Sequence, residues 1–88
     1  MIATSDIVMY STGWCPYCER ARALLQRKGL PFREIKVDED PTERQAMLAR
    51  SGGRRTVPQI FIGERHVGGF DELYSLDKAG GLDELTAA

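Results

Sequence analysis

The chain has 88 residues, of which 42% are hydrophobic and 28% are charged, as in an ordinary globular domain. Its 12 basic and 13 acidic residues give a net charge of −1, which argues against nucleic-acid binding and against a patch for anionic membranes. No apolar run reaches the roughly 20 residues of a membrane span, and the N-terminus lacks a signal-peptide pattern. We expect one domain over residues 1–88 that acts as a monomer, in the cytoplasm or, if an upstream presequence is missing, in another reducing compartment.

The first half of the chain alternates between strand and helix patterns. Residues 7–10 are a short β-favouring run, and residues 16–28 carry apolar side chains at the three- and four-residue spacing of a helix. Residues 32–37 then alternate apolar and polar, as a half-exposed strand does. After an acidic turn, a second helix opens at Pro41 and ends at the Ser-Gly-Gly segment 51–53.

The second half predicts a hairpin and a third helix. Residues 59–62 and 65–67 are strand-like runs joined by a short turn, and residues 70–78 have helical spacing. Residues 82–85 are expected to add one short turn. The order β-α-β-α-β-β-α predicts an α/β fold, in which a right-handed crossover joins two parallel strands and the hairpin adds an antiparallel edge. We expect a four-stranded mixed β-sheet flanked by helices on both faces.

The chain has two cysteines, Cys15 and Cys18, separated by two residues. A secreted disulfide scaffold would carry more cysteines, spread along the chain, and a structural zinc site requires four ligands. The one histidine, His66, is distant in the sequence, and we treat it as a surface or edge-strand residue. A C-x-x-C motif that follows a strand and opens a helix indicates catalytic redox chemistry instead.

The position of the motif assigns different roles to its two thiols. Cys15 lies just before the first helical turn, where unpaired N–H groups and the helix dipole favour the nucleophilic thiolate. Cys18 lies one turn further in and is predicted to be the resolving thiol, which attacks a mixed disulfide on Cys15. Two structural alternatives stay open, namely half of a metal site completed by a second chain, or a pair of core cysteines.

Two further segments carry a resemblance to a known family. The Thr-Val-Pro segment 56–58 and the Gly-Gly-Phe-Asp segment 68–71 resemble the matching segments of glutaredoxins. Together with the Cys-Pro-Tyr-Cys motif at 15–18, they resemble the bacterial dithiol type, in the same order and along nearly the whole chain. The resemblance implies the thioredoxin fold and a cis peptide bond before Pro58.

The resemblance also implies a site for glutathione as the reducing co-substrate. In glutaredoxins, the residue that matches Tyr17 flanks the glutathione sulfur, those that match Phe70 and Asp71 hold the γ-glutamyl end, and the one that matches Arg44 contacts the glycine carboxylate. An extended ligand would pair with the backbone of Val57 as an added strand. The implied glutathione-binding residues are Tyr17, Arg44, Thr56, Val57, Pro58, Gly69, Phe70 and Asp71.

Several of these residues also have a plainer interpretation. Pro58 can simply start a strand, Asp71 can cap the third helix, and Arg44 can lie on a solvated helix face. One departure from the family is clear, because glutaredoxins usually carry a lysine where this chain has Thr12. A carboxylate contact is therefore lost or taken over by Arg44 or Arg55, and weaker glutathione binding is expected.

These observations predict a glutathione-dependent thiol–disulfide oxidoreductase that reduces protein–glutathione mixed disulfides and small disulfides, with ribonucleotide reductase as a further candidate partner. No metal site and no tightly bound cofactor is expected. Two alternatives stay open: a redoxin reduced by thioredoxin reductase, and a carrier in which a dimer ligates an iron–sulfur cluster through Cys15 and glutathione. Pro16 argues against the carrier, because cluster-binding relatives usually have a smaller or more flexible residue there.

Overall fold

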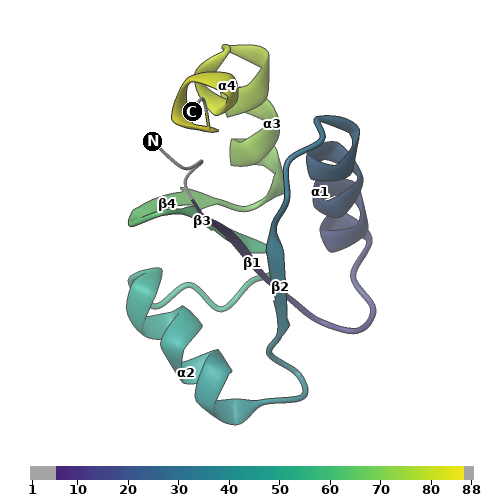
Figure 1. Ribbon diagram of the computed structural model, residues 1–88. Helices are drawn as coiled ribbons and strands as arrows, with labels where there is room; N and C mark the ends of the chain where they lie inside the picture. Colours follow the sequence, from purple (N-terminus) through teal and green to yellow (C-terminus); the bar gives the residue numbers. More distant parts are fainter. Residues whose placement is uncertain (1–5, 87–88) are drawn as a thin grey trace.

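The centre of the molecule is a four-stranded sheet in the computed structural model, which describes residues 6–86 (Figure 1). Its strands are β1 (Ile7–Ser11), β2 (Arg33–Lys36), β3 (Gln59–Ile62) and β4 (Arg65–Gly68). The order across the sheet is β2-β1-β3-β4, with β1 parallel to β2, β1 antiparallel to β3 and β3 antiparallel to β4. The predicted parallel crossover and antiparallel hairpin are both confirmed.

Helices cover both faces of the sheet, as expected. One side carries α1 (Pro16–Arg27), α3 (Phe70–Lys78) and α4 (Gly81–Thr86), and the other carries α2 (Pro41–Arg50) (Figure 1). Because successive strand residues face opposite sides, Met9 lies in a buried cluster with Leu25 of α1, whereas Tyr10 lies in a second cluster with Met47 of α2. None of the helices within residues 6–86 has the length and apolar character that a membrane crossing requires.

The helix that follows the first strand begins where the sequence predicts. Pro16 is its first residue, and Cys15, in an extended conformation, is its N-cap. At the start of α2, the carboxylate of Asp40 accepts hydrogen bonds from the N–H groups of Thr42 and Glu43, at 3.0 and 3.3 Å. The predicted acidic turn therefore also supplies the N-cap of α2, a role that sequence analysis did not assign.

Several boundaries differ from the prediction by one residue, since β1 ends at Ser11, α1 at Arg27 and β4 at Gly68. β2 is shorter than expected by one residue at each end, at Phe32 and Val37, although the N–H of Val37 still donates to the carbonyl of Ser11 at 2.8 Å. The segment expected to form one short turn at 82–85 is the helix α4. It begins at Gly81, directly after Gly80 adopts a φ of +83°, a conformation that favours glycine where one helix ends.

Candidate active site

Cys15 lies at the N-terminal end of α1, in the connection that follows β1. Its sulfur accepts a hydrogen bond from the N–H of Cys18 at 3.2 Å, so the side chain caps the helix. The same sulfur lies 3.8 Å from the carbonyl oxygen of Val57. A partly exposed sulfur that receives an N–H from a helix start is well placed to carry the charge of a thiolate nucleophile.

Cys18 lies on the inner face of α1, and only 1% of it is exposed. Burial, followed by the hydrogen bond with Cys15, raises the pKa of the Cys18 thiol from its ordinary 9.0 to about 12. This thiol therefore stays protonated at neutral pH, while Cys15 is partly open to solvent. The contrast supports the predicted division of roles, with Cys15 attacking and Cys18 resolving.

We expect iodoacetamide to label the folded, reduced protein once, at Cys15, near pH 8. With a pKa of about 12, only about one Cys18 thiol in ten thousand is ionised at that pH, and the side chain is buried. Mass spectrometry of the intact protein and of its peptides measures the number and place of the adducts. Urea is the control, because unfolding should admit a second label; prompt double labelling of the folded protein would contradict the expectation.

A groove opens where the segment before β3 meets the start of α3. The peptide bond between Val57 and Pro58 in that segment is cis, which confirms what the resemblance implied. The groove is lined by Tyr17, Arg54, Thr56, Val57, Pro58, Gly69, Phe70, Asp71 and Glu72. The structure therefore brings together every residue predicted to bind glutathione except Arg44.

The arginine that lines the groove is Arg54, which the sequence did not single out. Arg44 is exposed on α2 and is not among the lining residues. The loop after α2 turns through Gly52 and Gly53, which have φ values of +72° and +94°. The path of this loop, which leads to Arg54, cannot be read from residue spacing. The sequence feature that could have pointed to Arg54 is the Arg54-Arg55 pair directly before the Thr-Val-Pro segment.

The start of α3 leaves Asp71 available to the groove. The N-cap position is Gly69, whose N–H donates to the carboxylate of Glu72 at 2.6 Å. The interpretation of Asp71 as the cap of this helix is therefore wrong, because Glu72 satisfies the helix start from the third helical position. The rings of Tyr17 and Phe70, which line the same groove, have centroids 6.4 Å apart. A carboxylate and two aromatic rings thus frame the groove.

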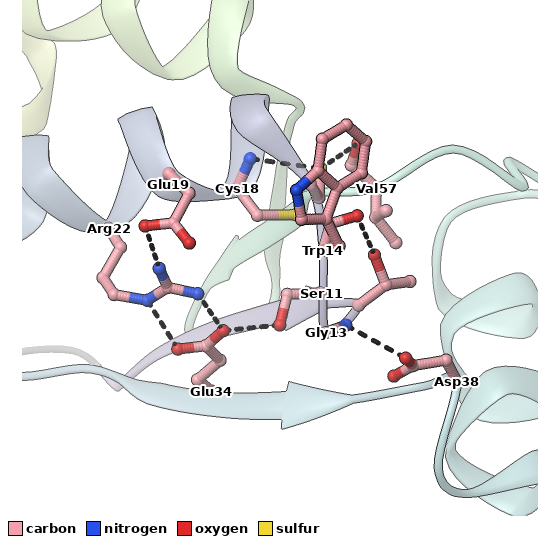
Figure 2. A network of polar contacts seen from close by, with 11 residues as sticks. Ser11, Gly13, Trp14, Cys18, Glu19, Arg22, Glu34, Asp38 and Val57 are labelled. Carbon is pink, nitrogen blue, oxygen red and sulfur yellow. Dashed lines mark hydrogen bonds and ion pairs between the residues drawn. The ribbon is translucent and has the colours of Figure 1, made fainter.

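The loop before Cys15 differs from the family at Thr12. The Thr12 hydroxyl donates to the carbonyl of Trp14 at 3.3 Å, and the N–H of Gly13 donates to the carboxylate of Asp38 at 3.0 Å (Figure 2). Trp14 itself is 85% exposed. The charged group held against this loop is therefore a carboxylate, where the family pattern would place a lysine ammonium.

Replacing Thr12 by lysine is expected to lower the KM for a glutathionylated substrate about two- to fivefold, the effect of one exposed ion pair. The added ammonium would attract the glycine carboxylate of the ligand and offset the charge of Asp38. Steady-state kinetics at low and high salt measure the change, which should shrink as salt screens it. Thr12→Met is the matched control of similar length without charge, and an equal gain in that variant would refute the electrostatic explanation.

A partly buried ion pair joins α1 to the sheet. Arg22 donates to both carboxylate oxygens of Glu34, at 2.9 and 2.6 Å, and the hydroxyl of Ser11 donates to the same carboxylate at 2.6 Å (Figure 2). Arg22 also pairs with Glu19 at 2.9 Å. The hydrogen bonds from Arg22 hold the pKa of Glu34 below its usual range. This network fixes the helix that presents the two cysteines.

The site is made of two thiols and a backbone segment. Within the part of the chain that the structure describes, no three His, Cys, Asp or Glu side chains are placed to hold a metal ion. Cys15 and Cys18 instead open a helix that packs on a mixed four-stranded sheet, next to the carbonyl of a residue that precedes a cis proline. This combination defines a dithiol oxidoreductase of the thioredoxin fold.

Comparison with known proteins identifies the family. The glutaredoxin family model matches residues 7–67. A glutaredoxin of Pseudomonas aeruginosa is 58% identical over 82 residues, which cover 93% of this chain and 96% of the relative. Glutaredoxin 3 of Escherichia coli K12 is 51% identical over 81 residues, which cover 92% of this chain and 96% of that protein.

Solved structures show the same likeness. The solution structure of a glutaredoxin from Brucella melitensis superposes with a TM-score of 0.82 and 50% identity, over 97% of this chain and 91% of that chain. A crystal structure of a buckwheat glutaredoxin–glutathione complex gives a TM-score of 0.83 at 30% identity, over 93% of this chain and 76% of that chain. The chain belongs to the glutaredoxin family, and it is a thiol–disulfide oxidoreductase.

Proposed function

We propose that this glutaredoxin uses glutathione to reduce protein–glutathione mixed disulfides and small disulfides. The observation that carries the proposal is the position of the Cys15 sulfur, 3.8 Å from the carbonyl of Val57, which lines the groove. A ligand whose sulfur reacts with Cys15 can then extend along the backbone of Val57. The buckwheat glutaredoxin–glutathione complex, a structural neighbour over most of the chain, supports the choice of ligand.

In the first step, the Cys15 thiolate attacks the glutathione sulfur of a mixed disulfide. The substrate S–S bond breaks, its protein sulfur leaves as a thiolate and takes up a proton, and Cys15 becomes bonded to glutathione. In the monothiol route, the thiolate of a second glutathione attacks that bond, which releases oxidised glutathione and regenerates the Cys15 thiolate. One free glutathione is consumed in this route, and the other half of the oxidised glutathione is the glutathionyl group that Cys15 took from the substrate.

In the dithiol route, Cys18 resolves the intermediate. Its thiol loses a proton and attacks the Cys15 sulfur, so that glutathione leaves and an intramolecular disulfide forms. Two further glutathione molecules then reduce that disulfide. Because the pKa of Cys18 is raised to about 12 by burial, this route needs Cys18 to lose its proton during the attack, and the monothiol route competes with it.

The groove residues have complementary roles in this proposal. Val57 pairs with the extended backbone of glutathione, and Asp71 pairs with its ammonium group. Tyr17 packs beside the glutathione sulfur, with half of its surface exposed for that contact. Arg54 lines the groove and can pair with a carboxylate of the tripeptide, in addition to the predicted contact from Arg44.

We also propose an oligomeric state, a cellular location and protein partners for this chain. We expect the 88 residues to form a single domain that acts as a cytoplasmic monomer, without a tightly bound cofactor. Proteins that carry glutathione on a cysteine are its proposed partners, and ribonucleotide reductase is a candidate for the dithiol route. Size-exclusion chromatography with light scattering tests the monomer, and a dimer mass would contradict it.

The test is turnover of a glutathionylated peptide by the full chain, coupled to NADPH through glutathione and glutathione reductase. We expect turnover that requires glutathione. Reduction without glutathione, by thioredoxin reductase, would overturn the proposal in favour of a thioredoxin-reductase-linked redoxin. Absence of turnover from a folded protein with two free thiols would also overturn it.

A further inference from the structure

The hydrogen-bonding partners of Thr56 point to a role for two residues that lie outside the groove. Gln59, at the start of β3, is fully buried, and its Nε2 donates to the carbonyl of Thr56 at 2.9 Å and to the Thr56 hydroxyl at 3.2 Å. Its Oε1 lies 2.6 Å from Nε2 of His66 on β4. A chain of hydrogen bonds therefore runs from the edge strand to the segment that faces Cys15.

Donor and acceptor chemistry fixes the orientation of the Gln59 amide and the tautomer of His66 in this chain of hydrogen bonds. A carboxamide oxygen only accepts hydrogen bonds, so Nε2 of His66 must carry the hydrogen. Turning the Gln59 amide over would place its oxygen against the Thr56 carbonyl oxygen, an unfavourable contact between two acceptors. The Thr56 carbonyl therefore selects the amide orientation, and His66, as donor to the Gln59 oxygen, stabilises it.

The ring of His66 is itself held in place. It stacks on Phe61, with centroids 4.7 Å apart and planes 23° from parallel. Burial, with a smaller contribution from the charge of Arg54, lowers the pKa of His66, so the neutral ring with hydrogen on Nε2 is the form present near pH 7. Protonation would keep that hydrogen, and the hydrogen bond to Gln59 therefore does not depend on the charge of the ring.

The hydrogen bond from Gln59 to the Thr56 carbonyl also sets the direction of the Val57 N–H, because both groups belong to the peptide unit between Thr56 and Val57. Only the next peptide bond along, Val57–Pro58, is cis among the described residues, so the Thr56–Val57 unit is trans. In a trans peptide, the C=O and the following N–H point in opposite directions. Because the Thr56 carbonyl is drawn toward Gln59, the Val57 N–H is directed away from Gln59.

We propose that Gln59 and His66 are positioning residues, which orient the backbone of Val57 for pairing with the extended backbone of the substrate. The inference deepens the proposed function and rests on it, since the substrate is taken to be a glutathione disulfide that pairs with Val57. Neither residue touches the reacting sulfur atoms in this proposal. They act through Thr56, whose backbone they hold.

The test separates positioning from simple stability. His66→Phe keeps a ring that can stack on Phe61 but leaves the buried Gln59 oxygen without its donor, so it should lower both stability and kcat/KM. The double variant Gln59→Met with His66→Phe removes the unsatisfied group, so its stability toward urea should return most of the way to that of wild type. Its kcat/KM for a glutathionylated peptide should nevertheless stay about tenfold low, mainly through KM, because nothing orients Val57.

Nuclear magnetic resonance gives a readout that does not need catalysis. In the double variant, the amide signals of Thr56 and Val57 should shift, whereas those of α1 should stay in place. Glu64→Gln, an exposed change in the same hairpin, is the matched control and should leave the Val57 signal unchanged. An unchanged Val57 amide in the double variant, or wild-type KM in an active protein, would overturn the inference. If the wild type does not turn over the peptide, the proposed function fails, while the Val57 signal still decides the positioning role.

Discussion

Replacement of Cys15 by serine is expected to abolish turnover of a glutathionylated peptide, by on the order of a thousandfold or more. The serine hydroxyl is far less acidic than a thiol, so it does not ionise at the helix start and cannot form the mixed disulfide that begins each cycle. As the N-cap of α1, the serine hydroxyl can still accept the hydrogen bond from the N–H of Cys18, so the fold should be preserved. The measurement is the coupled glutathione reductase assay, with circular dichroism to verify that the variant is folded.

Cys18→Ser is the matched comparison, because it removes the other thiol of the same motif. In the monothiol route, a second glutathione resolves the intermediate, so we expect this variant to keep turnover within about threefold of wild type on a glutathionylated peptide. It should lose the intramolecular disulfide, which quantitation of free thiols after oxidation detects. Full activity in Cys15→Ser would show that the nucleophile is wrongly assigned, and loss of activity in Cys18→Ser alone would show that the dithiol route is obligatory.

The parts of this molecule that local sequence determines are those that were predicted well. α1 begins at Pro16 because proline suits a first helical turn, and its apolar residues recur with the helical period. β3 and β4 lie on either side of a short turn around Gly63, which has a φ of +60°. The assignment of Cys15 as the nucleophile stays a prediction, and it also rests on local sequence, because Cys15 lies next to the start of α1.

The contacts that sequence analysis missed are set by residues distant in the chain or by loop conformation. Arg54 lines the groove, and it follows a loop that turns through two glycines with positive φ after α2. His66 was correctly predicted to lie on an edge strand, but its hydrogen bond to Gln59 joins two strands, and the register of that pair is irregular between Ile60 and Phe61. Periodicity places residues on a face of a strand, and it does not report such a register shift.

A large effect on stability is expected from Arg22→Met, which should lower the free energy of unfolding near pH 7 by about 2 kcal/mol. The side chains of Arg22 and Glu34 are only 23% and 19% exposed, so removal of the guanidinium leaves a poorly solvated carboxylate with the Ser11 hydroxyl as its remaining hydrogen-bond donor among these three residues. Loss of a fully buried partner costs about 3–5 kcal/mol, and the partial exposure of this pair reduces that value. Urea unfolding followed by tryptophan fluorescence measures the difference.

The difference in unfolding free energy between wild type and Arg22→Met should depend on pH in a definite direction. In the folded protein, hydrogen bonds from Arg22 hold the pKa of Glu34 below its ordinary 4.5, and on unfolding the pKa returns to that value. The contribution of the pair is therefore fully present above pH 4.5 and is lost as the pH falls through the lower pKa of the folded state. The stabilities of wild type and Arg22→Met should accordingly differ most near neutral pH and converge in acid.

The double variant Arg22→Met with Glu34→Leu distinguishes the cost of an unpaired charge from a net benefit of the ion pair. With both charges replaced by apolar groups, no carboxylate is left poorly solvated, and stability should recover most of the loss seen in the single variant. A double variant as unstable as Arg22→Met would mean that the pair itself stabilises the join between α1 and β2. A single variant as stable as wild type near pH 7 would mean that solvent already screens this pair, and that the position of Cys15 depends on helix packing alone.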